Sequence, residues 1–299
     1  MESDPVISVV IPNFNYRRFV AEAVESVFQQ GGSGWEVIVV DDGSTDGSRE
    51  VLSGFGEKIR LILQENRGPA AARNRGATQA RGEYLLFLDS DDLLLEGALA
   101  LYAGEIEKNP EEDLLCGDAV LVDQEGGRTP LKAHLPRRKG SPFEALLWEN
   151  GLITSAVLVK RETFQSVGGF DEDQALRVVE DYDLWLRLLR SGARLRLLGE
   201  ETVLKRSHGE NISGSGLKIV VPEEALVNKW LSRERDSETL DLLRQKRSRL
   251  LRLATYHARE SGDRRLFRHY SWRALLSDPS HPKGWIYSLW ALLFPFPKR

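Results

Sequence analysis

Three carboxylates follow one apolar run within four positions. Leu85 to Leu88 indicate a buried strand, and Asp89, Asp91 and Asp92 come directly after it. Like charges this close raise one another's pKa values unless a positive charge lies among them. An all-oxygen ligand set favours Mg²⁺ or Mn²⁺, which keep coordination positions open for phosphate oxygens. We therefore predict a divalent metal site; the alternative is a solvated acidic turn before a helix that begins near Glu96.

The elements that would position these acids are strands alternating with helices. We expect strands over 6–11, 36–40, 59–63 and 85–88, and helices over 16–30 and 69–80 with a shorter one ending near residue 53. This alternation indicates βαβ units and a parallel sheet covered on both faces. Ligands of such sheets bind beyond the carboxyl ends of the strands. Pro12-Asn13, Asp41-Asp42 and the acids after residue 88 all fall at these ends, so we expect them to converge.

Two common nucleotide-binding signatures do not occur. The first strand is followed by Pro12-Asn13-Phe14-Asn15 rather than by a G-x-G-x-x-G turn. The sequence also has no G-x-x-x-x-G-K-[ST] loop. The pattern therefore argues against the common dinucleotide-binding fold and against a P-loop NTPase.

The charge of the chain is unevenly distributed. The net charge is −4 over 299 residues, which argues against nucleic acid as a partner. Residues 222–299 hold 16 Lys and Arg against nine Asp and Glu, a net charge of +7, so residues 1–221 carry −11. A basic tail region on an acidic body predicts that the tail meets an anionic surface. Cys116 is the single cysteine, which excludes an intrachain disulfide and a cysteine-based zinc site.

The two ends of the sequence bear on location. Residues 1–5 are acidic and polar, unlike a secretory signal peptide, and no apolar run reaches the roughly 20 residues that span a bilayer. We expect a cytoplasmic protein. Residues 284–297 are strongly apolar with Trp and Tyr, and basic residues flank them, which is typical of a peripheral anchor at the inner face of a membrane. The alternative is that this segment packs on the rest of the chain or on a second subunit.

Six motifs in order resemble those of the family 2 glycosyltransferases. They cover roughly residues 5–215 and read Val-Val-Ile-Pro-Asn-Phe-Asn (9–15), Val-Val-Asp-Asp-Gly-Ser-Thr-Asp (39–46), Asn-Arg-Gly-Pro-Ala-Ala-Ala-Arg-Asn (66–74), Phe-Leu-Asp-Ser-Asp-Asp (87–92), Val-Gly-Gly-Phe-Asp-Glu (167–172) and Glu-Asp-Tyr-Asp-Leu-Trp-Leu-Arg (180–187). The resemblance implies an α/β chain of the GT-A fold, a Rossmann-like mixed sheet flanked by helices. We expect this catalytic domain over 1–221 and a helical extension over 222–299, with helices at 222–232, 237–260 and 263–276.

The resemblance also implies a donor site. Pro12 and Asn13 would line the nucleotide base, Asp42 would accept from a base N–H, and Arg73 would reach the base or the diphosphate. Asp91 would ligate the metal directly, Asp89 would contact the ribose or a metal-bound water, and His208 would be a third ligand. The alternatives are surface acids near a helix cap for Asp42, a solvated side chain for Arg73 and an inert loop histidine. For Asp92 we favour the N-cap of the following helix.

An acceptor site follows from the same resemblance. Asp181 would be the general base, with Glu180 beside it to position the acceptor. Thr154, Ser155 and Trp185 would contact the acceptor. The alternative for Asp181 is an acid at a helix N-terminus that the helix dipole favours.

The predicted function is that of a metal-dependent glycosyltransferase. It would move a sugar from a nucleotide diphosphate, with a UDP-sugar favoured, to a hydroxyl of a saccharide or lipid-linked acceptor with inversion, in polysaccharide or cell-envelope biosynthesis. One alternative is a sugar nucleotidyltransferase, although such enzymes begin with a glycine- and lysine-rich loop. The other is a catalytically inactive nucleotide- or carbohydrate-binding scaffold, which has no chemical need for Asp42, Asp89, Asp91 and Asp181 together.

Overall fold

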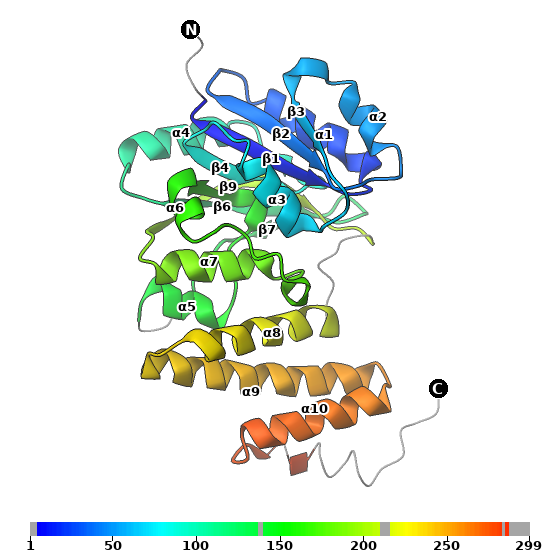
Figure 1. Ribbon diagram of the computed structural model, residues 1–299, viewed down its shortest axis with the longest axis vertical. Coiled ribbons are helices and arrows are strands. Elements are labelled where there is room, and N and C mark those ends of the chain that lie inside the picture. The colour runs from blue at the N-terminus through cyan, green and yellow to red at the C-terminus, as the bar shows by residue number, and fades with distance from the viewer. Residues whose placement is uncertain (1–4, 137–139, 210–215, 283–284, 287–299) are drawn as a thin grey trace. The chain divides into compact units, whose positions relative to one another are not determined.

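The computed structural model describes residues 5–136, 140–209, 216–282 and 285–286 (Figure 1). The chain divides into two compact units. The first comprises residues 1–172 and 180–210, and the second comprises 173–179 and 211–299.

The first unit is built on a nine-stranded sheet in which β3, β2, β1 and β4 lie side by side and run parallel (Figure 1). Beyond β4 the order continues β8, β6, β9, β5, with β7 paired to β6, and β8 is antiparallel to both of its neighbours. The sheet is therefore mixed, as the resemblance implied. The strands are β1 Ile7–Asn13, β2 Trp35–Asp41, β3 Arg60–Leu63, β4 Tyr84–Phe87, β5 Leu93–Leu94, β6 Leu114–Val122, β7 Arg128–Leu131, β8 Val157–Lys160 and β9 Leu195–Arg206.

Alternate residues of the central strands face different helices. Val37 and Val39 of β2 belong to a core cluster with Val20, Val24 and Val27 of α1, at helical spacing. Ile38 and Val40 belong instead to a cluster with Ala72 of α3. Helices thus cover both faces of the parallel strands, as predicted. The helices of this unit are α1 Arg17–Phe28, α2 Ser48–Ser53, α3 Pro69–Ala77, α4 Ala98–Lys108, α5 Pro142–Trp148, α6 Arg161–Ser166 and α7 Glu180–Arg190, with short 3-10 turns η1 Gly56–Lys58 and η2 Thr154–Ala156.

Helix α3 lies unusually close to the sheet. A Cβ atom at Gly76 would stand 2.3 Å from a methyl carbon of Val10, so this position admits only glycine at this separation. At its other end Gly68 has a φ of +94° and Pro69 occupies the first turn, where its missing N–H costs nothing. The tight packing fixes the direction in which Arg73 leaves the helix.

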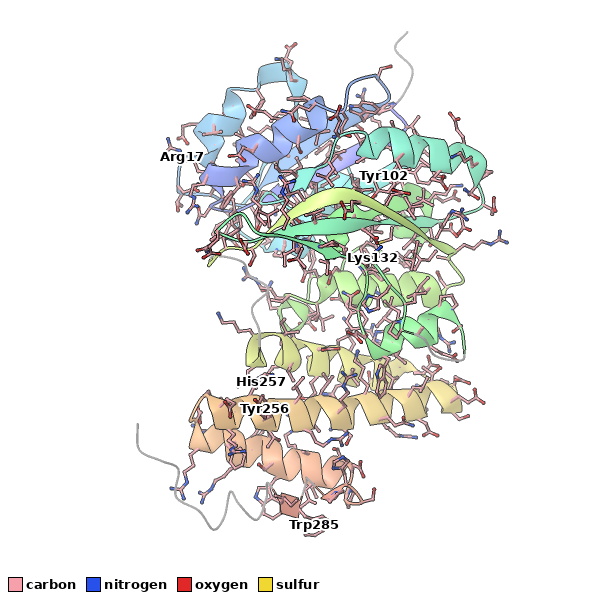
Figure 2. The ribbon with its side chains drawn as sticks, turned by 180° about the vertical axis from the view of Figure 1, so that it is seen from behind. Arg17, Tyr102, Lys132, Tyr256, His257 and Trp285 are labelled. Atoms are coloured by element: carbon pink, nitrogen blue, oxygen red, sulfur yellow. The ribbon has the colours of Figure 1, made fainter. Side chains whose placement is uncertain are left out.

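Helix α4 packs against strand β9. Tyr102 of α4 is fully buried, and its hydroxyl donates to the Ala156 carbonyl at 2.7 Å and lies 3.0 Å from the hydroxyl of Thr202 (Figure 2). Helix α4 begins at Ala98 after Gly97 and has no side-chain cap. The interpretation of Asp92 as the N-cap of this helix was therefore wrong.

Within its described residues, the second unit contains the helices α8 Leu217–Arg233, α9 Ser237–Glu260 and α10 Arg264–Ser277, and the 3-10 turn η3 Gln174–Leu176. The bounds expected for α9 are confirmed and those for α10 differ by one residue, because Asp236 and Asp263 each cap the helix that follows. Helix α8 starts before the predicted residue 222, and Pro222 lies inside it. Among the residues that the structure describes, no helix is long and apolar enough to cross a membrane.

Candidate functional site

The loops after β1 and β2 are joined by buried polar contacts. Asn13 is 1% exposed, and its amide donates to the Asp41 carboxylate at 3.0 Å and to the Ser44 hydroxyl at 3.2 Å. Burial opposes ionisation of Asp41, but hydrogen bonds from Ser44, Arg49 and Asn13 outweigh it and lower the pKa. Pro12 is also buried, and it lies opposite Val40 of β2 in the parallel pairing. Both residues predicted to line the base thus lie where β1 ends.

Asp42 fastens the loop that precedes α3. One carboxylate oxygen accepts from the backbone N–H of Arg67 at 2.8 Å and from the side-chain amide of Gln64 at 2.7 Å, and the other accepts from the backbone N–H of Gly68 at 2.8 Å. The side chain is 3% exposed. Asp42 is therefore a buried anchor between two loops, and a nucleotide base that contacted it would share a carboxylate that already accepts three hydrogen bonds.

The three acids after β4 lie together, as their spacing predicted. One oxygen from each of Asp89, Asp91 and Asp92 lies within 4.8 Å of the others. Asp92 is fully buried and accepts from the Ser155 hydroxyl at 2.7 Å, the Lys205 ammonium at 3.3 Å and the Arg206 backbone N–H at 3.2 Å. Burial raises the pKa of Asp92 to about 6, although Lys205 opposes this. Asp92 ties the end of β9 to the acidic turn.

Asp91 lies next to His208. The Nε2 atom of His208 is 3.1 Å from a carboxylate oxygen of Asp91, and its ring stacks on Phe19 at 4.6 Å with Tyr16 at its edge. Burial and the charge of Asp89 raise the pKa of Asp91. A cation bound by Asp91, Asp89 and His208 would relieve this repulsion. The two carboxylates suit Mn²⁺ or Mg²⁺ with positions left for other oxygens, so Asp89 and Asp91 fit the predicted metal.

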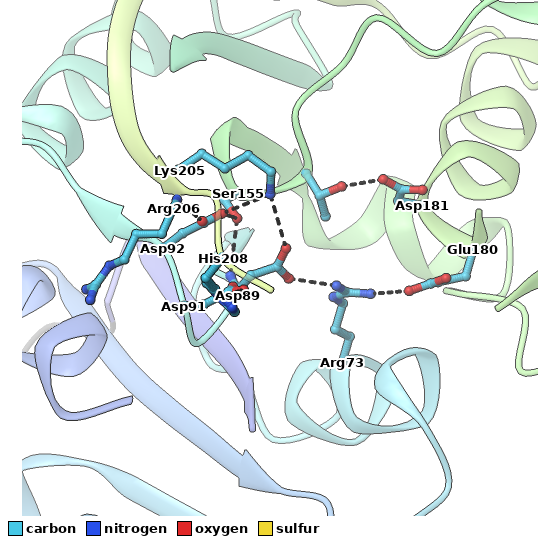
Figure 3. A network of polar contacts seen from close by, with 11 residues as sticks. Arg73, Asp89, Asp91, Asp92, Ser155, Glu180, Asp181, Lys205, Arg206 and His208 are labelled. Carbon is cyan, nitrogen blue, oxygen red and sulfur yellow. Dashed lines mark hydrogen bonds and ion pairs between the residues drawn. The ribbon is translucent and has the colours of Figure 1, made fainter. Parts of the chain in front are cut away.

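Arg73 lies between two acidic segments (Figure 3). Its guanidinium donates to Asp89 at 2.7 Å and to Glu180 at 2.7 Å, and the residue is 6% exposed. The two carboxylates outweigh the effect of burial and raise the pKa of Arg73. The alternative of a solvated arginine is wrong. Donor contact would require the guanidinium to exchange or share these partners.

Lys205 is a site residue that the sequence reasoning missed. Its ammonium lies 3.3 Å from Asp92 and 4.0 Å from Asp89, and these acids raise its pKa. The available signal was its position three residues before His208, directly after the apolar pair Val203-Leu204. It places a fixed positive charge beside the predicted metal ligands.

Asp181 faces a hydroxyl group rather than a cation. It stands in the first turn of α7, where Thr154 donates to one carboxylate oxygen and the Tyr182 N–H donates to the other at 2.6 Å. Burial and the neighbouring charge of Glu180 raise the pKa of Asp181 to about 6. Glu180 itself turns away, to Arg73. A carboxyl with this pKa can take up a proton near neutral pH.

Two predicted acceptor contacts need correction. Trp185 is fully buried, with its ring at the edge of Phe170, so it belongs to the core and offers an acceptor no surface. Ser155 is 1% exposed, and its hydroxyl donates to Asp92 while accepting from the backbone N–H of Asp89 at 3.2 Å. It holds the acidic turn instead. Thr154 is partly exposed and keeps its place beside Asp181.

Comparison with known proteins relates the chain, by sequence and by fold, to other proteins. The family model of glycosyl transferase family 2 matches residues 8–168. TuaG of Bacillus subtilis strain 168, a glycosyltransferase assigned to teichuronic acid biosynthesis, is 31% identical over 192 residues, which is 63% of this chain and 73% of TuaG. The glycosyltransferase EpsE of the same strain is 28% identical over 204 residues, 65% of this chain and 70% of EpsE.

Solved structures share the fold. TarS residues 1–349 of S. aureus, in complex with UDP-GlcNAc, superimpose with a TM-score of 0.66 at 18% identity, covering 91% of this chain and 81% of that one. The chain covers 49% of the longer TarS structure. The mannosyltransferase PcManGT from Pyrobaculum calidifontis, in complex with GDP-Man and Mn²⁺, has a TM-score of 0.60 at 17% identity and covers 97% and 85% of the two chains.

Proposed function

This chain belongs to glycosyl transferase family 2, and from that premise we propose that it transfers a sugar from a nucleoside-diphosphate donor to an acceptor hydroxyl with inversion at the anomeric carbon. The observation that carries the proposal is the pair of acids with unlike surroundings at one end of the sheet. Asp91 lies among potential metal ligands, and Asp181 faces the hydroxyl of Thr154. The first arrangement suits a diphosphate and the second suits a proton transfer.

On the donor side, Asp91, Asp89 and His208 would hold Mn²⁺ or Mg²⁺. When bound, the cation supplies positive charge to the departing diphosphate. Lys205 adds a second positive charge that the chain itself provides. Pro12, Asn13 and Asp42 would receive the nucleotide at the ends of β1 and β2. The complexes of TarS with UDP-GlcNAc and of PcManGT with GDP-Man and Mn²⁺ support a nucleotide-sugar donor, and we favour a UDP-sugar.

On the acceptor side, Asp181 acts as the general base. The acceptor oxygen forms a bond to the anomeric carbon, the bond from that carbon to the diphosphate oxygen breaks, and the acceptor proton passes to Asp181. Thr154 orients the carboxylate by donating to one of its oxygens. Because the pKa of Asp181 is about 6, most molecules carry the ionised base at neutral pH, yet the group is basic enough to take the proton.

The acceptor that we propose is a saccharide or a lipid-linked saccharide of a polysaccharide or cell-envelope pathway. TuaG, which is assigned to teichuronic acid biosynthesis, supports this class of product. A single displacement needs one acceptor hydroxyl beside Asp181, which a growing glycan chain provides.

The test is release of free nucleoside diphosphate. The chain is incubated with Mn²⁺, a saccharide acceptor panel and UDP-, GDP-, dTDP- or CDP-sugars in turn. We expect one donor to release its nucleoside diphosphate in an acceptor-dependent manner, and the same nucleotide to raise the melting temperature until EDTA removes the metal. If no nucleotide raises the melting temperature in the presence of metal, the scaffold alternative is favoured instead.

We propose in addition that the C-terminal unit contacts an anionic membrane surface through residues 284–297, of which only Trp285 and Ile286 are among the described residues (Figure 2). These two are 52% and 59% exposed, and α10, which precedes them, has four arginines and no acid. Co-sedimentation with vesicles containing phosphatidylglycerol should be lost in a Trp285→Ser, Ile286→Ser double variant and absent with neutral phosphatidylcholine vesicles. Failure of the unmodified chain to sediment would favour packing of the segment on protein.

A further inference from the structure

Lys205 lies against two of the three acids in the turn after β4, and it is held unequally by them (Figure 3). Its ammonium is 3.3 Å from Asp92, within hydrogen-bond distance, but 4.0 Å from Asp89, a separation at which only the attraction between the charges acts. The Lys205 side chain is 30% exposed, whereas Asp92 is fully buried. The ammonium is therefore held mainly by Asp92, and part of the side chain is open to solutes.

The backbone of Lys205 is fixed, but its side chain can turn. In β9 the residue lies opposite Leu121 of β6, and its neighbour Leu204 pairs with Leu93, the residue after Asp92. A lysine carries its charge on a flexible four-carbon stem and has three hydrogens to donate. One hydrogen can therefore stay on Asp92 while another is donated to a second acceptor.

Asp89 faces a different cation with each of its carboxylate oxygens. Its Oδ1 atom accepts from Arg73 at 2.7 Å, and its Oδ2 atom is the one that Lys205 approaches. Because Arg73 engages Oδ1, a divalent cation that bound Asp89 would bind at Oδ2. Two cations at one oxygen repel each other, so a bound metal ion would weaken the attraction between Asp89 and Lys205.

We propose that Lys205 competes with a divalent cation for Asp89, and that the ammonium displaced by the cation becomes a ligand of the donor diphosphate. The proposal rests on the function proposed above and names how its donor site changes when metal binds. A diphosphate bound to that cation would bring its oxygens close to the ammonium, and hydrogen bonds between oppositely charged groups are the strong ones. Lys205 thus offsets the charge of Asp89 before the metal binds and that of the diphosphate afterwards.

The first measurement uses Mn²⁺ alone, without nucleotide. Mn²⁺ is titrated into the unmodified chain and into Lys205→Met, and the free ion is followed by electron paramagnetic resonance. We expect Lys205→Met to bind Mn²⁺ about tenfold more tightly, because a competing positive charge has been removed. Equal or weaker binding of Mn²⁺ by the variant would overturn the competition.

The second measurement uses nucleotides in saturating Mn²⁺. UDP, GDP, dTDP and CDP are titrated in turn into both chains by isothermal titration calorimetry. The nucleotide that binds the unmodified chain should bind Lys205→Met about tenfold more weakly, because a charged hydrogen bond to the diphosphate is lost. The affinities for Mn²⁺ and for the nucleotide should thus change in opposite directions. A purely structural loss would instead weaken both.

Lys132→Met is the matched control. The ammonium of Lys132 lies 3.7 Å from Asp118, which is 4% exposed, so this change also removes a lysine from a buried aspartate, but outside the acidic turn. It should alter neither affinity. If Lys205→Met does not fold, Asp92→Asn is compared with the double variant Lys205→Met, Asp92→Asn, in which the loss of the lysine leaves no buried charge at residue 92. The same opposite changes are expected between these two chains.

Failure of this proposal can be distinguished from failure of the function on which it rests. If no nucleotide binds the unmodified chain with Mn²⁺ present, the transferase function is rejected, and the Mn²⁺ titration still decides whether Lys205 competes for Asp89. If a nucleotide binds both chains equally well, the transferase function stands and Lys205 is not a ligand of the diphosphate.

Discussion

The chain has two acidic segments, Asp89–Asp92 and Glu180–Asp181. The first acids of the two segments share a partner, whereas the later acids have different ones. The first acid of each, Asp89 and Glu180, pairs with the same guanidinium, that of Arg73. A later acid of each, Asp91 and Asp181, has a raised pKa. Asp91 has other potential ligands around it, whereas Asp181 has the hydroxyl of Thr154. Two residues of one type, Asp91 and Asp181, thus acquire different chemistry from the partners that the fold brings to them.

We expect the largest effect from a substitution at Asp91, which tests the proposed metal site. Asp91→Asn removes the charged oxygen that we propose as a metal ligand, so we expect kcat/KM to fall about 10⁴-fold and the metal-dependent rise in melting temperature with nucleotide to disappear. Glu200→Gln, an exposed acid on β9, is the control and should change neither measurement. An Asp91→Asn chain that keeps the metal-dependent shift would contradict the assignment.

Asp181→Asn tests the proposed role of Asp181 as the general base. The amide cannot accept the acceptor proton, and we expect kcat to fall about 10³-fold while donor binding, followed by the same thermal shift, is retained. At neutral pH the variant should also be more stable by about 1–2 kcal/mol, because the unmodified carboxyl must ionise in a site that raises its pKa. Urea unfolding at pH 7 and at pH 4 measures this, and the gain should vanish at pH 4.

Lys205→Met tests what the ammonium group of Lys205 contributes, independently of a bound metal ion. The change leaves fully buried Asp92 without its ammonium partner and should cost about 3 kcal/mol of unfolding free energy at pH 7. The cost should shrink toward pH 5, because the pKa of Asp92 is already about 6 and a neutral carboxyl needs no cation. Adding Asp92→Asn should recover part of the loss. Equal costs at both pH values would mean that packing of the lysine stem is what was lost.

The smallest predicted effect is the pH dependence of the unmodified chain. A base must be ionised, and the pKa of Asp181 is raised to about 6, so kcat/KM should be level above pH 7 and fall tenfold per pH unit below 6. Because the raised pKa opposes ionisation of the folded protein, the stability contributed by Asp181 is fully present below about pH 4 and lost as the pH rises through 6. If the acidic limb of the kcat/KM profile were centred near pH 4, the Asp181 carboxyl would be solvated.

Local pattern predicted the strand ends well. Strands β1, β2 and β4 start and end within two residues of the expected positions, because β-branched runs and the polar residues after them are local signals. The spacing of Leu184, Trp185 and Leu188 is that of one face of a helix, and all three residues are buried in the core. The resemblance had favoured an acceptor contact there, and the periodicity was the better guide.

Partners distant in sequence could not be predicted. The ammonium and the backbone N–H that Asp92 accepts come from residues 113 and 114 positions away, and Glu180 lies 107 positions from Arg73. The sequence around Asp92 does not distinguish a helix cap from a buried anchor. The sequence around Arg73 likewise does not distinguish an exposed arginine from a buried one. Those assignments depend on which strand lies beside β6 and how closely α3 approaches the sheet.

The three hydrogen bonds to Asp42 have a consequence for motion. The backbone N–H groups of Arg67 and Gly68 belong to a loop, yet both are bound by a carboxylate that is 3% exposed. Their hydrogens should exchange with solvent deuterium as slowly as those of the neighbouring strands, unlike those of an ordinary loop. The rim that would receive a nucleotide is thus already in place before any ligand arrives, and little ordering entropy remains to be lost on binding.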